Sequence, residues 1–210
     1  MPLYKSHFFD SNTQILVWEI TETFDELRPQ VVLNMKNRRR LEGMKSQMHQ
    51  IGFLSVRKLL QEAGYNDLEL YYDEFGKPHL KDEKHISITH SHHFSAIIIS
   101  DKTVGIDIEL HREKIIRIAD KFATKELEYL NNNNTKEYIQ KLTVIWGAKE
   151  AIFKIQNEKG ISFKDHINVQ SFDLDKNQTT ADLTFGNIHK KFNIYYESVK
   201  GFGLVYAMEA

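Results

Sequence analysis

Hydrophobic and other residues alternate strictly between residues 104 and 110. Val104 and every second residue after it up to Leu110 are aliphatic, whereas Gly105, Asp107 and Glu109 fall between them. This period of two predicts a strand whose two carboxylates share one face, about 7 Å apart. Carboxylates held this close repel each other unless a cation or a proton offsets the repulsion. The pattern alone fits either the solvated face of an antiparallel sheet or a cation-binding strand.

A second pattern, with spacings of three and four, predicts a helix over residues 135–157. Its apolar stripe consists of Ile139, Leu142, Ile145, Trp146, Ile152 and Phe153. At about 100° per residue, Lys149 falls in the middle of this stripe, and Glu150 and Lys154 fall together on its flank. A surface Glu–Lys pair and a lysine that extends out of the core are the ordinary interpretations. They explain less well why an ammonium interrupts the stripe beside a third carboxylate.

The rest of the chain mixes the same two periodicities. Strands are predicted at residues 14–20, 68–72, 85–90, 94–100, 168–174, 181–185, 191–197 and 203–208. A capping-box spacing from Thr23 to Glu26 predicts a short helix, and longer helices are predicted at residues 36–63 and 115–130. Each half of the chain is mainly helix first and antiparallel strands afterwards. This order indicates an α+β protein, and composition alone would allow one domain.

Composition narrows the function classes. The 210 residues contain 28 Lys and Arg against 29 Asp and Glu, so a net charge of −1 provides no global attraction for nucleic acid or for an acidic membrane. The absence of cysteine excludes disulfides, thiolate metal sites and a cysteine nucleophile. The first residues lack the apolar core of a secretion signal, and the longest aliphatic clusters are too short for a bilayer. We therefore expect a soluble, cytoplasmic, monomeric protein.

Two segments together resemble a known family. The pairing of Val104-Gly-Ile-Asp-Ile-Glu109 with Trp146-Gly-Ala-Lys-Glu-Ala-Ile-Phe-Lys154 is similar to the signature of the 4'-phosphopantetheinyl transferases. It most resembles the larger class, which modifies carrier domains of peptide and polyketide synthetases. Three further segments match in order: Phe75-Gly-Lys-Pro78, Ile88-Thr-His-Ser91 and Lys121-Phe-Ala-Thr-Lys-Glu126. The departures are Thr89 for a more usual serine and the small pair Gly147-Ala148.

The resemblance implies a fold of two similar α+β subdomains with pseudo-two-fold symmetry, each with antiparallel strands packed on helices. Residues 1–102 would form the N-terminal subdomain, which recognises the nucleotide of coenzyme A. Residues 103–210 would form the C-terminal subdomain, which carries the metal, the catalytic residues and the docking surface for the carrier. The active site is expected between the two.

The resemblance also implies the reaction. The 4'-phosphopantetheine arm of coenzyme A would move to a serine hydroxyl of an apo acyl carrier protein or a peptidyl or polyketide carrier domain, releasing adenosine 3',5'-bisphosphate. Asp107, Glu109 and Glu150 would hold Mg²⁺ (or Mn²⁺), which takes oxygen ligands and keeps waters and phosphate oxygens in its shell. Glu150, Lys154 and Asp107 are the expected catalytic residues. The sequence leaves open whether Glu150 or a metal-bound water is the base.

Coenzyme A binding is expected from residues in both halves: Lys36, Arg38, Arg39, Arg40, Lys77, Pro78, His90, Ser91, Lys149 and Lys154. The four cations from residue 36 to 40 would bind the 3'-phosphate at a helix start, and a solvated basic turn is the alternative interpretation. His92 and His93 follow His90, but no second cluster of metal ligands lies at zinc-like spacing, so a zinc site is not expected.

Carrier docking is expected on residues 112–121, where Lys114, Arg117 and Lys121 surround Ile115 and Ile116. An ordinary amphipathic helix with its isoleucines facing the core is the alternative. Two other function classes remain open: a non-catalytic module that binds carrier proteins, and a Mg²⁺-dependent hydrolase of nucleotide pyrophosphates.

Overall fold

The computed structural model describes residues 2–210 and divides into two units, the first ending at Lys102 and the second covering Thr103–Ala210. This boundary coincides with the expected one. Each unit combines helices with antiparallel sheet, so the predicted α+β class is confirmed. Among the described residues, no helix has the length and apolar character that crossing a bilayer requires.

The first unit has a four-stranded antiparallel sheet, in the order β1-β2-β6-β5, and a small two-stranded one, β3-β4. The strands are β1 (Leu3–Asp10), β2 (Thr13–Glu19), β3 (Leu70–Tyr72), β4 (Pro78–Leu80), β5 (His85–Ser91) and β6 (Phe94–Ser100). The helices are α1 (Phe24–Leu27), η1 (Arg28–Gln30, a 3₁₀ turn), α2 (Met35–Glu42) and α3 (Gln47–Glu62). The predicted capping box is confirmed, because Thr23 and Glu26 bond each other's backbone at the start of α1.

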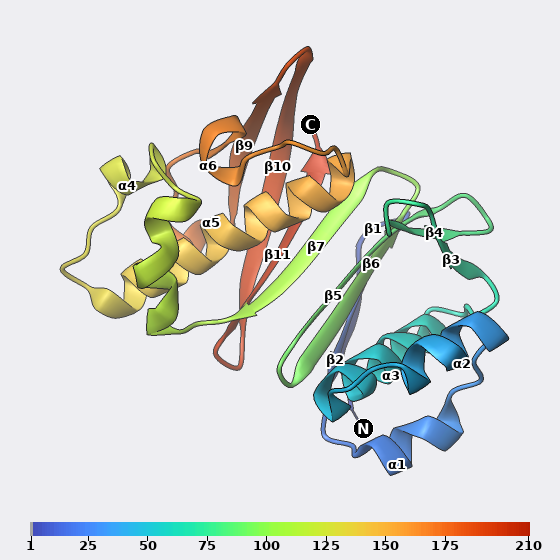
Figure 1. Cartoon of the computed structure of the whole chain (residues 1–210). Helices are drawn as coiled ribbons and strands as arrows, with labels where there is room; N and C mark the ends of the chain where they lie inside the picture. Colours follow the sequence, from blue (N-terminus) through green and yellow to red (C-terminus); the bar gives the residue numbers. More distant parts are fainter. Residues whose placement is uncertain (1) are drawn as a thin grey trace. The chain divides into compact units, whose positions relative to one another are not determined.

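Helix α3 covers one face of the larger sheet (Figure 1). Leu16 and Trp18 of β2 pack with Val56, Leu59 and Leu60 of α3 in one buried cluster. The side of α3 that faces this sheet is therefore aliphatic, and the side chains of β2 that it contacts are apolar.

The predicted helix over residues 36–63 is wrong in one respect, because it is two helices. Helix α2 ends at Glu42 with Gly43 as its C-cap, and α3 begins only at Gln47. The Gln50 side chain donates to the carbonyl of Leu41, in the last turn of α2, and to that of Met44, in the connection between the two helices. The basic residues thus belong to a short helix of their own.

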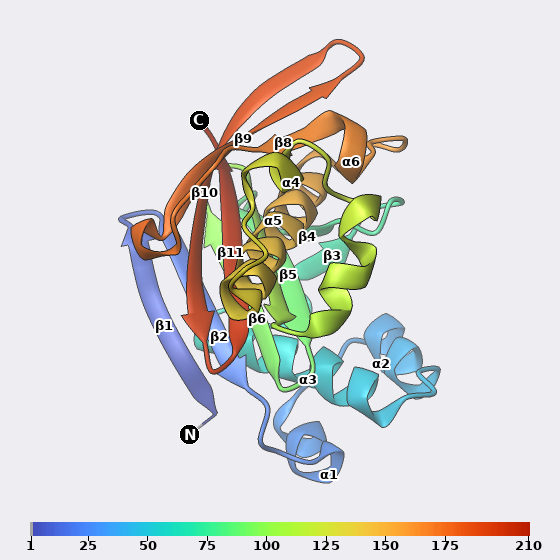
Figure 2. The ribbon, with the colours of Figure 1, turned by 90° about the vertical axis from the view of Figure 1, so that its left-hand side faces the viewer.

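The second unit is a five-stranded antiparallel sheet in the order β7-β11-β10-β9-β8. Its strands are β7 (Val104–Leu110), β8 (Ile167–Val169), β9 (Gln178–Phe185), β10 (Ile188–Val199) and β11 (Phe202–Glu209). Its helices are η2 (Glu113–Lys121, 3₁₀), α4 (Glu126–Tyr129), α5 (Thr135–Gln156), α6 (Phe163–His166) and η3 (Leu174–Lys176, 3₁₀). Figure 1 shows α5 running along β7 and β11, and Figure 2 shows the β9–β10 hairpin extending beyond the helices.

Several predicted boundaries differ from the structure. The expected helix at 115–130 is a 3₁₀ segment followed by one turn of α-helix, and the expected strand at 168–174 ends at Val169. Strands β1 and β4 and helix α6 were not predicted. The predictions for 94–100, 104–110 and α5 match within a residue. The elements that carry the second unit's candidate chemistry are therefore the best predicted.

Candidate active site

Helix α5 and strand β7 approach each other so closely that only glycine fits between their backbones. A Cβ on Gly105 would lie 2.0 Å from the carbonyl oxygen of Ala151. A Cβ on Gly147 would lie 2.8 Å from Val205 Cγ2 of β11 and 3.7 Å from Asp107 Oδ2. The face of β7 that bears Gly105 and Asp107 is thus covered by the helix, and the alternative of a solvated strand face is wrong for Asp107, which is 5% exposed.

An ion pair across this crossing joins Lys154 to Asp107. Lys154 Nζ lies 2.9 Å from Asp107 Oδ1 and donates to the carbonyl of Ile106 at 2.8 Å. The aspartate side chain is nearly buried, and that of the lysine is 27% exposed. The ammonium therefore partly neutralises the buried carboxylate while staying partly accessible to solvent.

Glu150 experiences the same group of charges. Burial, together with the charges of Asp107 and Glu109, raises the pKa of its carboxyl to about 7, and the Lys154 ammonium acts in the opposite direction. The three predicted acidic residues are thus electrostatically coupled, although they come from two elements more than forty residues apart. A carboxyl group whose pKa is raised beside other carboxylates is typical of functional sites, and structural clusters also produce it.

The chemistry of this donor set fits a hard divalent cation. Mg²⁺ binds oxygen ligands, and one or two carboxylates often suffice because water and substrate phosphates complete its shell. Residues 2–210 contain no group of three or more Asp, Glu, His or Cys arranged as ready metal ligands. The carboxylates of Asp107, Glu109 and Glu150 therefore stay a predicted metal site that fits by chemistry and charge, with Lys154 as the neighbouring cation.

Lys149 has a different role from the predicted one. It is fully buried, and its ammonium lies 2.6 Å from Glu126 Oε1 and donates to the carbonyls of Phe122 and Phe163. Burial lowers its pKa, and the Glu126 charge acts in the opposite direction. Because an ammonium has three donors and all three are used here, Lys149 has none left for coenzyme A in this structure.

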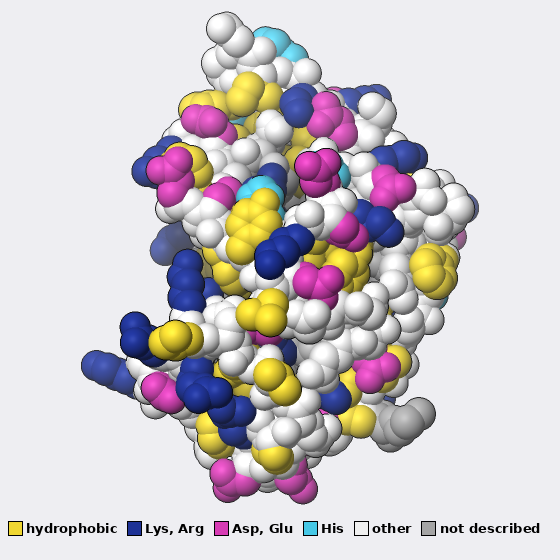
Figure 3. All heavy atoms as spheres, turned by 90° about the vertical axis from the view of Figure 1, so that its right-hand side faces the viewer, with side chains coloured by type: hydrophobic (Ala, Val, Ile, Leu, Met, Phe, Trp, Pro, Cys, Tyr) yellow, Lys and Arg dark blue, Asp and Glu magenta, His cyan; other side chains and the backbone are white. Residues whose placement is uncertain are grey.

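In the first unit, the four predicted cations all lie on α2 and are exposed: Lys36, Arg38, Arg39 and Arg40. The Asn34 side chain caps the helix, and Arg40 stacks over the rings of Phe53 and Tyr72 at 5.7 and 5.0 Å. Figure 3 looks onto the face that carries α2 and the β3–β4 hairpin. Lys and Arg side chains gather along one edge of it, with hydrophobic side chains among them.

A buried ion pair fixes the start of this basic helix. Asp67 lies 3.1 Å from Arg57 Nε and also accepts from the Asn37 side chain and from the backbone N–H of Asn34. The pair is nearly inaccessible, at 3% and 2% side-chain exposure. Asp67 thus connects α3 to the first turn of α2.

The predicted turn Phe75–Pro78 forms the connection between β3 and β4. Gly76 has a φ of +84°, which favours glycine, and Asp73 Oδ1 accepts from the backbone N–H groups of Phe75 and Lys77. Phe75 is exposed, and Lys77 and Pro78 are half-buried. The turn therefore presents an aromatic ring and an ammonium from a fixed hairpin.

His90 and Ser91 lie at the end of β5. A Cβ on Gly52 of α3 would lie 3.3 Å from His90 Cγ, so the histidine ring lies against the helix at this glycine. The ring centroid of His49 is 6.3 Å away. His90 is exposed and Ser91 is half-buried, so the imidazole is accessible to a ligand.

The predicted docking segment is only partly amphipathic. Ile115 and Ile118 of η2 pack against the core of the second unit, whereas Ile116 is 36% exposed. Lys114, Arg117 and Lys121 are exposed. The surface of η2 therefore combines cations with a single accessible isoleucine.

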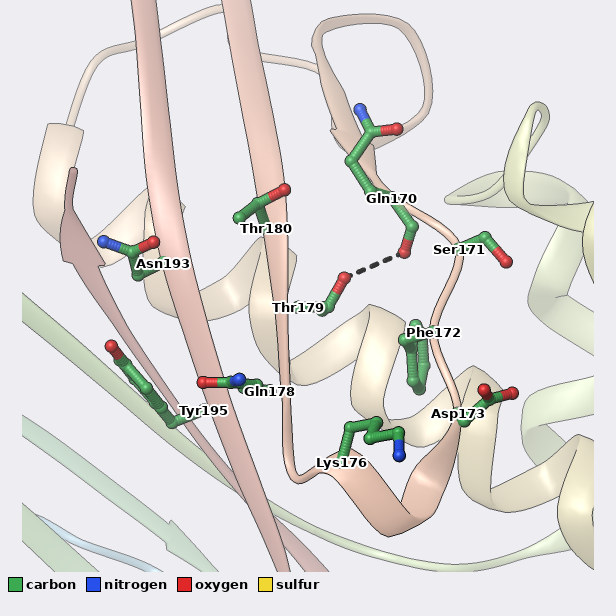
Figure 4. A pocket seen from close by; sticks show the side chains of 10 residues that line it. All are labelled: Gln170, Ser171, Phe172, Asp173, Lys176, Gln178, Thr179, Thr180, Asn193 and Tyr195. Carbon is green, nitrogen blue, oxygen red and sulfur yellow. Dashed lines mark hydrogen bonds between the residues drawn. The ribbon is translucent and has the colours of Figure 1, made fainter.

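A hollow elsewhere in the second unit contains none of the predicted site residues (Figure 4). Its lining is mostly amide and hydroxyl groups of β9, β10 and the segment after β8, and Thr179 Oγ1 donates to the Gln170 carbonyl there at 3.0 Å. We assign no ligand to it.

A model of the 4'-phosphopantetheinyl transferase superfamily matches residues 103–207, which is half of the chain. The chain belongs to this superfamily. The matched region contains Asp107, Glu109, Glu150 and Lys154 and lies wholly within the second unit. Superfamily membership is thus established on the part of the chain that carries the coupled carboxylates.

Individual transferases of the superfamily are also similar to the chain. The 4'-phosphopantetheinyl transferase gsp of Aneurinibacillus migulanus is 31% identical over 149 residues, which cover 69% of this chain and 61% of that protein. The 4'-phosphopantetheinyl transferase Sfp of Bacillus subtilis strain 168 is 30% identical over 118 residues, covering 53% and 52%. The alignments thus span between half and three-fifths of the relatives' length.

Sequence reasoning missed two buried ion pairs, one in each unit. Glu126 was quoted only as part of a motif, and Asp67 and Arg57 were not considered. For Glu126 a signal existed, because a lysine in the centre of an apolar stripe needs a buried carboxylate partner. Arg57 gave a similar signal, since it interrupts a buried helical run.

Proposed function

We propose that this chain transfers the 4'-phosphopantetheine arm of coenzyme A to a serine of an apo carrier protein. The observation that carries the proposal is the convergence of Asp107, Glu109 and Glu150 beside Lys154, within the region that the superfamily model matches. Carboxylates that repel one another need a cation, and a substrate rich in phosphate needs the same cation.

The bond changes define what the site has to do. The serine oxygen bonds to the phosphorus that carries the pantetheine arm, and the bond from that phosphorus to the bridging oxygen breaks. The electron pair leaves with adenosine 3',5'-bisphosphate, and the serine proton goes to a base. Lys154, which is partly exposed next to Asp107, would stabilise charge on the phosphoryl oxygens.

Asp107, Glu109 and Glu150 would hold the metal in this proposal. A bound Mg²⁺ would neutralise charge on the pyrophosphate. Glu150 takes part either as a ligand or as the acceptor of the serine proton, and a carboxylate with a pKa near 7 suits the second role. A carboxylate bound directly to the metal is a poorer base, so the two roles exclude each other at one oxygen.

Recognition of coenzyme A would use the exposed cations of α2, with Lys77 and Pro78 of the hairpin and His90 and Ser91 of β5. Arginines suit a phosphate because their donors form a rigid fork. The stacking of Arg40 on two rings makes Arg38 and Arg39 the more available pair. The carrier would dock on η2, where cations can attract an acidic partner.

A single assay separates this proposal from its two alternatives. The protein is incubated with coenzyme A and Mg²⁺, with and without an apo carrier protein, and release of adenosine 3',5'-bisphosphate is followed. Release that requires the carrier is the expected result. Release without carrier would mean pyrophosphate hydrolysis, and tight carrier binding without release would mean a non-catalytic module; either overturns the proposal.

A further inference from the structure

Helix α5 is held from two opposite sides. Gly147 and Ala151 face the sheet, where Gly105 and Val205 limit the distance of approach. At about 100° per residue, Lys149 projects some 160–200° away from these two positions. It therefore points to the segment from Phe122 to Glu126, on the far side of the helix from β7.

The contacts of Lys149 are directional and converge from separate parts of the unit. Its ammonium contacts the Glu126 carboxylate at 2.6 Å and donates to the carbonyls of Phe122 at 2.7 Å and Phe163 at 3.0 Å. Glu126 also accepts from the backbone N–H of Val169 at 3.0 Å and of Thr124 at 3.2 Å. One ion pair thus joins α5 to the segment before α4, to the start of α6 and to β8.

Stability alone does not explain this pair. Replacing a buried ion pair by well-packed apolar side chains is often neutral or stabilising, because removing two charges from water is costly. Aliphatic side chains would fill the same volume, but they would not fix the rotation of the helix about its axis. Three hydrogen bonds from one ammonium do fix it.

We propose that Glu126 and Lys149 are a positioning pair that sets the rotation of α5, and thereby places Glu150 and Lys154 against Asp107. The role in transfer rests on the proposed function. Neither residue of the pair touches substrate in this proposal. Lys149 is the immediate neighbour of Glu150, so any rotation that the pair prevents would displace that carboxylate directly.

The geometry gives the expected size of the effect. A side-chain end lies about 5–6 Å from the helix axis, so a rotation of about 10° moves it by about 1 Å. A misplacement of about 1 Å can reduce the rate of a positioned reaction about a hundredfold. We therefore expect a loss of kcat between about tenfold and a hundredfold, with little change in the KM for coenzyme A.

The test uses the double variant Glu126→Gln/Lys149→Met, which removes both charges together and leaves neither ion buried alone. The double variant Glu137→Gln/Lys141→Met is the matched control, because this ion pair is also on α5 but is more exposed, with 45% exposure for the Glu137 side chain and 14% for that of Lys141. Glu126→Asp is a second test variant that keeps both charges and shortens the link by one methylene. Thermal unfolding gives the folded fraction for each protein.

A readout that does not depend on activity follows the helix itself. The chain has two tryptophans, and Trp146 of α5 packs edge-on against Phe122 at 5.1 Å. In a Trp18→Phe background, the Trp146 emission should shift in both test variants and stay unchanged in the control. The Trp146 emission reports the position of α5 against its neighbours and does not depend on transfer activity. If the protein transfers nothing, the proposed function fails, but the rotation of α5 is still tested.

The positioning role is supported if either test variant folds and meets three conditions. Its kcat per folded molecule falls as expected, its KM for coenzyme A stays within about threefold of the parent value, and its Trp146 emission changes. Glu126→Asp should retain a higher kcat than the double variant Glu126→Gln/Lys149→Met. If the double variant does not fold, the result for Glu126→Asp alone tests the positioning role. Parent kcat in folded test variants, or an unchanged Trp146 signal, overturns the positioning role.

Discussion

The two units share one plan but differ at the place where helix meets strand. In each, a strand pairs with the last strand of the unit, β2 with β6 and β7 with β11, and one long helix covers them. In the first unit the strand positions that pack in the helix cluster are Leu16 and Trp18. In the second, the positions against the helix are Gly105 and Asp107. The first unit therefore forms the same arrangement of strands and helix without a carboxylate on the strand face that the helix covers.

Each helix also buries one cation, and here the units agree. Arg57 of α3 pairs with Asp67, and Lys149 of α5 pairs with Glu126. All four side chains are 3% exposed or less. The first pair fixes the start of the basic helix α2, and the second fixes the helix that carries Glu150. The comparison indicates that a buried ion pair organises each unit, whereas the carboxylate cluster is an addition that the fold does not require.

The largest expected effect on the transfer rate comes from removing a carboxylate of this cluster. Asp107→Ala or Glu150→Ala should reduce transfer by at least about a hundredfold, because each removes a proposed metal ligand. The fold should survive, because removing one of several like charges relieves repulsion. Transfer rates with Glu137→Ala as the control on the same helix check this. Parent activity in either variant, or in excess chelator, would contradict the assignment of the carboxylates to a metal.

The basic helix of the first unit gives the next effect. Neutralising Arg38 and Arg39, the pair that is not stacked on aromatic rings, should weaken binding of coenzyme A much more than binding of dephospho-coenzyme A. A lost charge-assisted contact costs about 1.5–3 kcal/mol, or about ten- to more than a hundredfold in affinity. Titration calorimetry with both ligands, and with Lys45→Gln as a control cation beyond the helix, measures the difference. Equal losses of affinity for the two ligands would mean that the arginines of α2 do not bind the 3'-phosphate.

The carboxylate cluster should also leave a pH signature on the stability of the metal-free protein. Glu150 has a pKa of about 7 when folded against a reference value of 4.5. The folded state therefore holds the proton more tightly, and the free energy of unfolding should fall as pH rises between these two values. Glu150→Gln should remove this loss and stabilise the protein at about pH 8 by about 1–2 kcal/mol, after a discount for partial exposure.

Denaturation in chelator at about pH 4 and about pH 8 checks the sign, because the variant should match the parent at the lower pH, where both side chains are neutral. A variant that is less stable than the parent at the higher pH would show that the carboxylate is stabilised when charged, contrary to the electrostatic account of the cluster.

The smallest effect is expected at η2. Charge reversal at Lys114 and Arg117 should lower the association rate with an acidic carrier several-fold at low salt, and it should reduce the salt dependence, as is usual for steering charges. Coenzyme A affinity should stay at the parent value. Stopped-flow association at two ionic strengths measures both. If the doubly reversed protein modifies its carrier at the parent rate in low salt, η2 is not the docking surface.

The sequence predicted the elements of the second unit's site well, because both have strong periodicity. Strict alternation located β7, and a long 3.6-residue pattern located α5. It misplaced the elements whose ends depend on distant groups. At the break between α2 and α3, the Gln50 side chain bonds the carbonyls of Leu41 and Met44, and residue spacing does not reveal this contact. Residue spacing does not reveal the 3₁₀ form of η2 either.

The candidate site was predictable in residue type but not in every role. Asp107, Glu150 and Lys154 lie near one another, as the resemblance to the transferases implied. Lys149 was expected among the residues that bind coenzyme A, but its direction on the helix takes it to Glu126. Neighbours in sequence on a helix point about 100° apart, so adjacency to a catalytic residue does not predict a shared ligand.

The central claim is that this chain adds a phosphopantetheine arm to a carrier serine. The most direct measurement is the intact mass of several apo carrier proteins after incubation with the protein, coenzyme A and Mg²⁺. The account predicts that at least one carrier gains the mass of a single phosphopantetheine arm, that its serine-to-alanine variant gains none, and that Asp107→Ala protein adds none. Unmodified carriers across the panel, with the protein folded and coenzyme A bound, would contradict it.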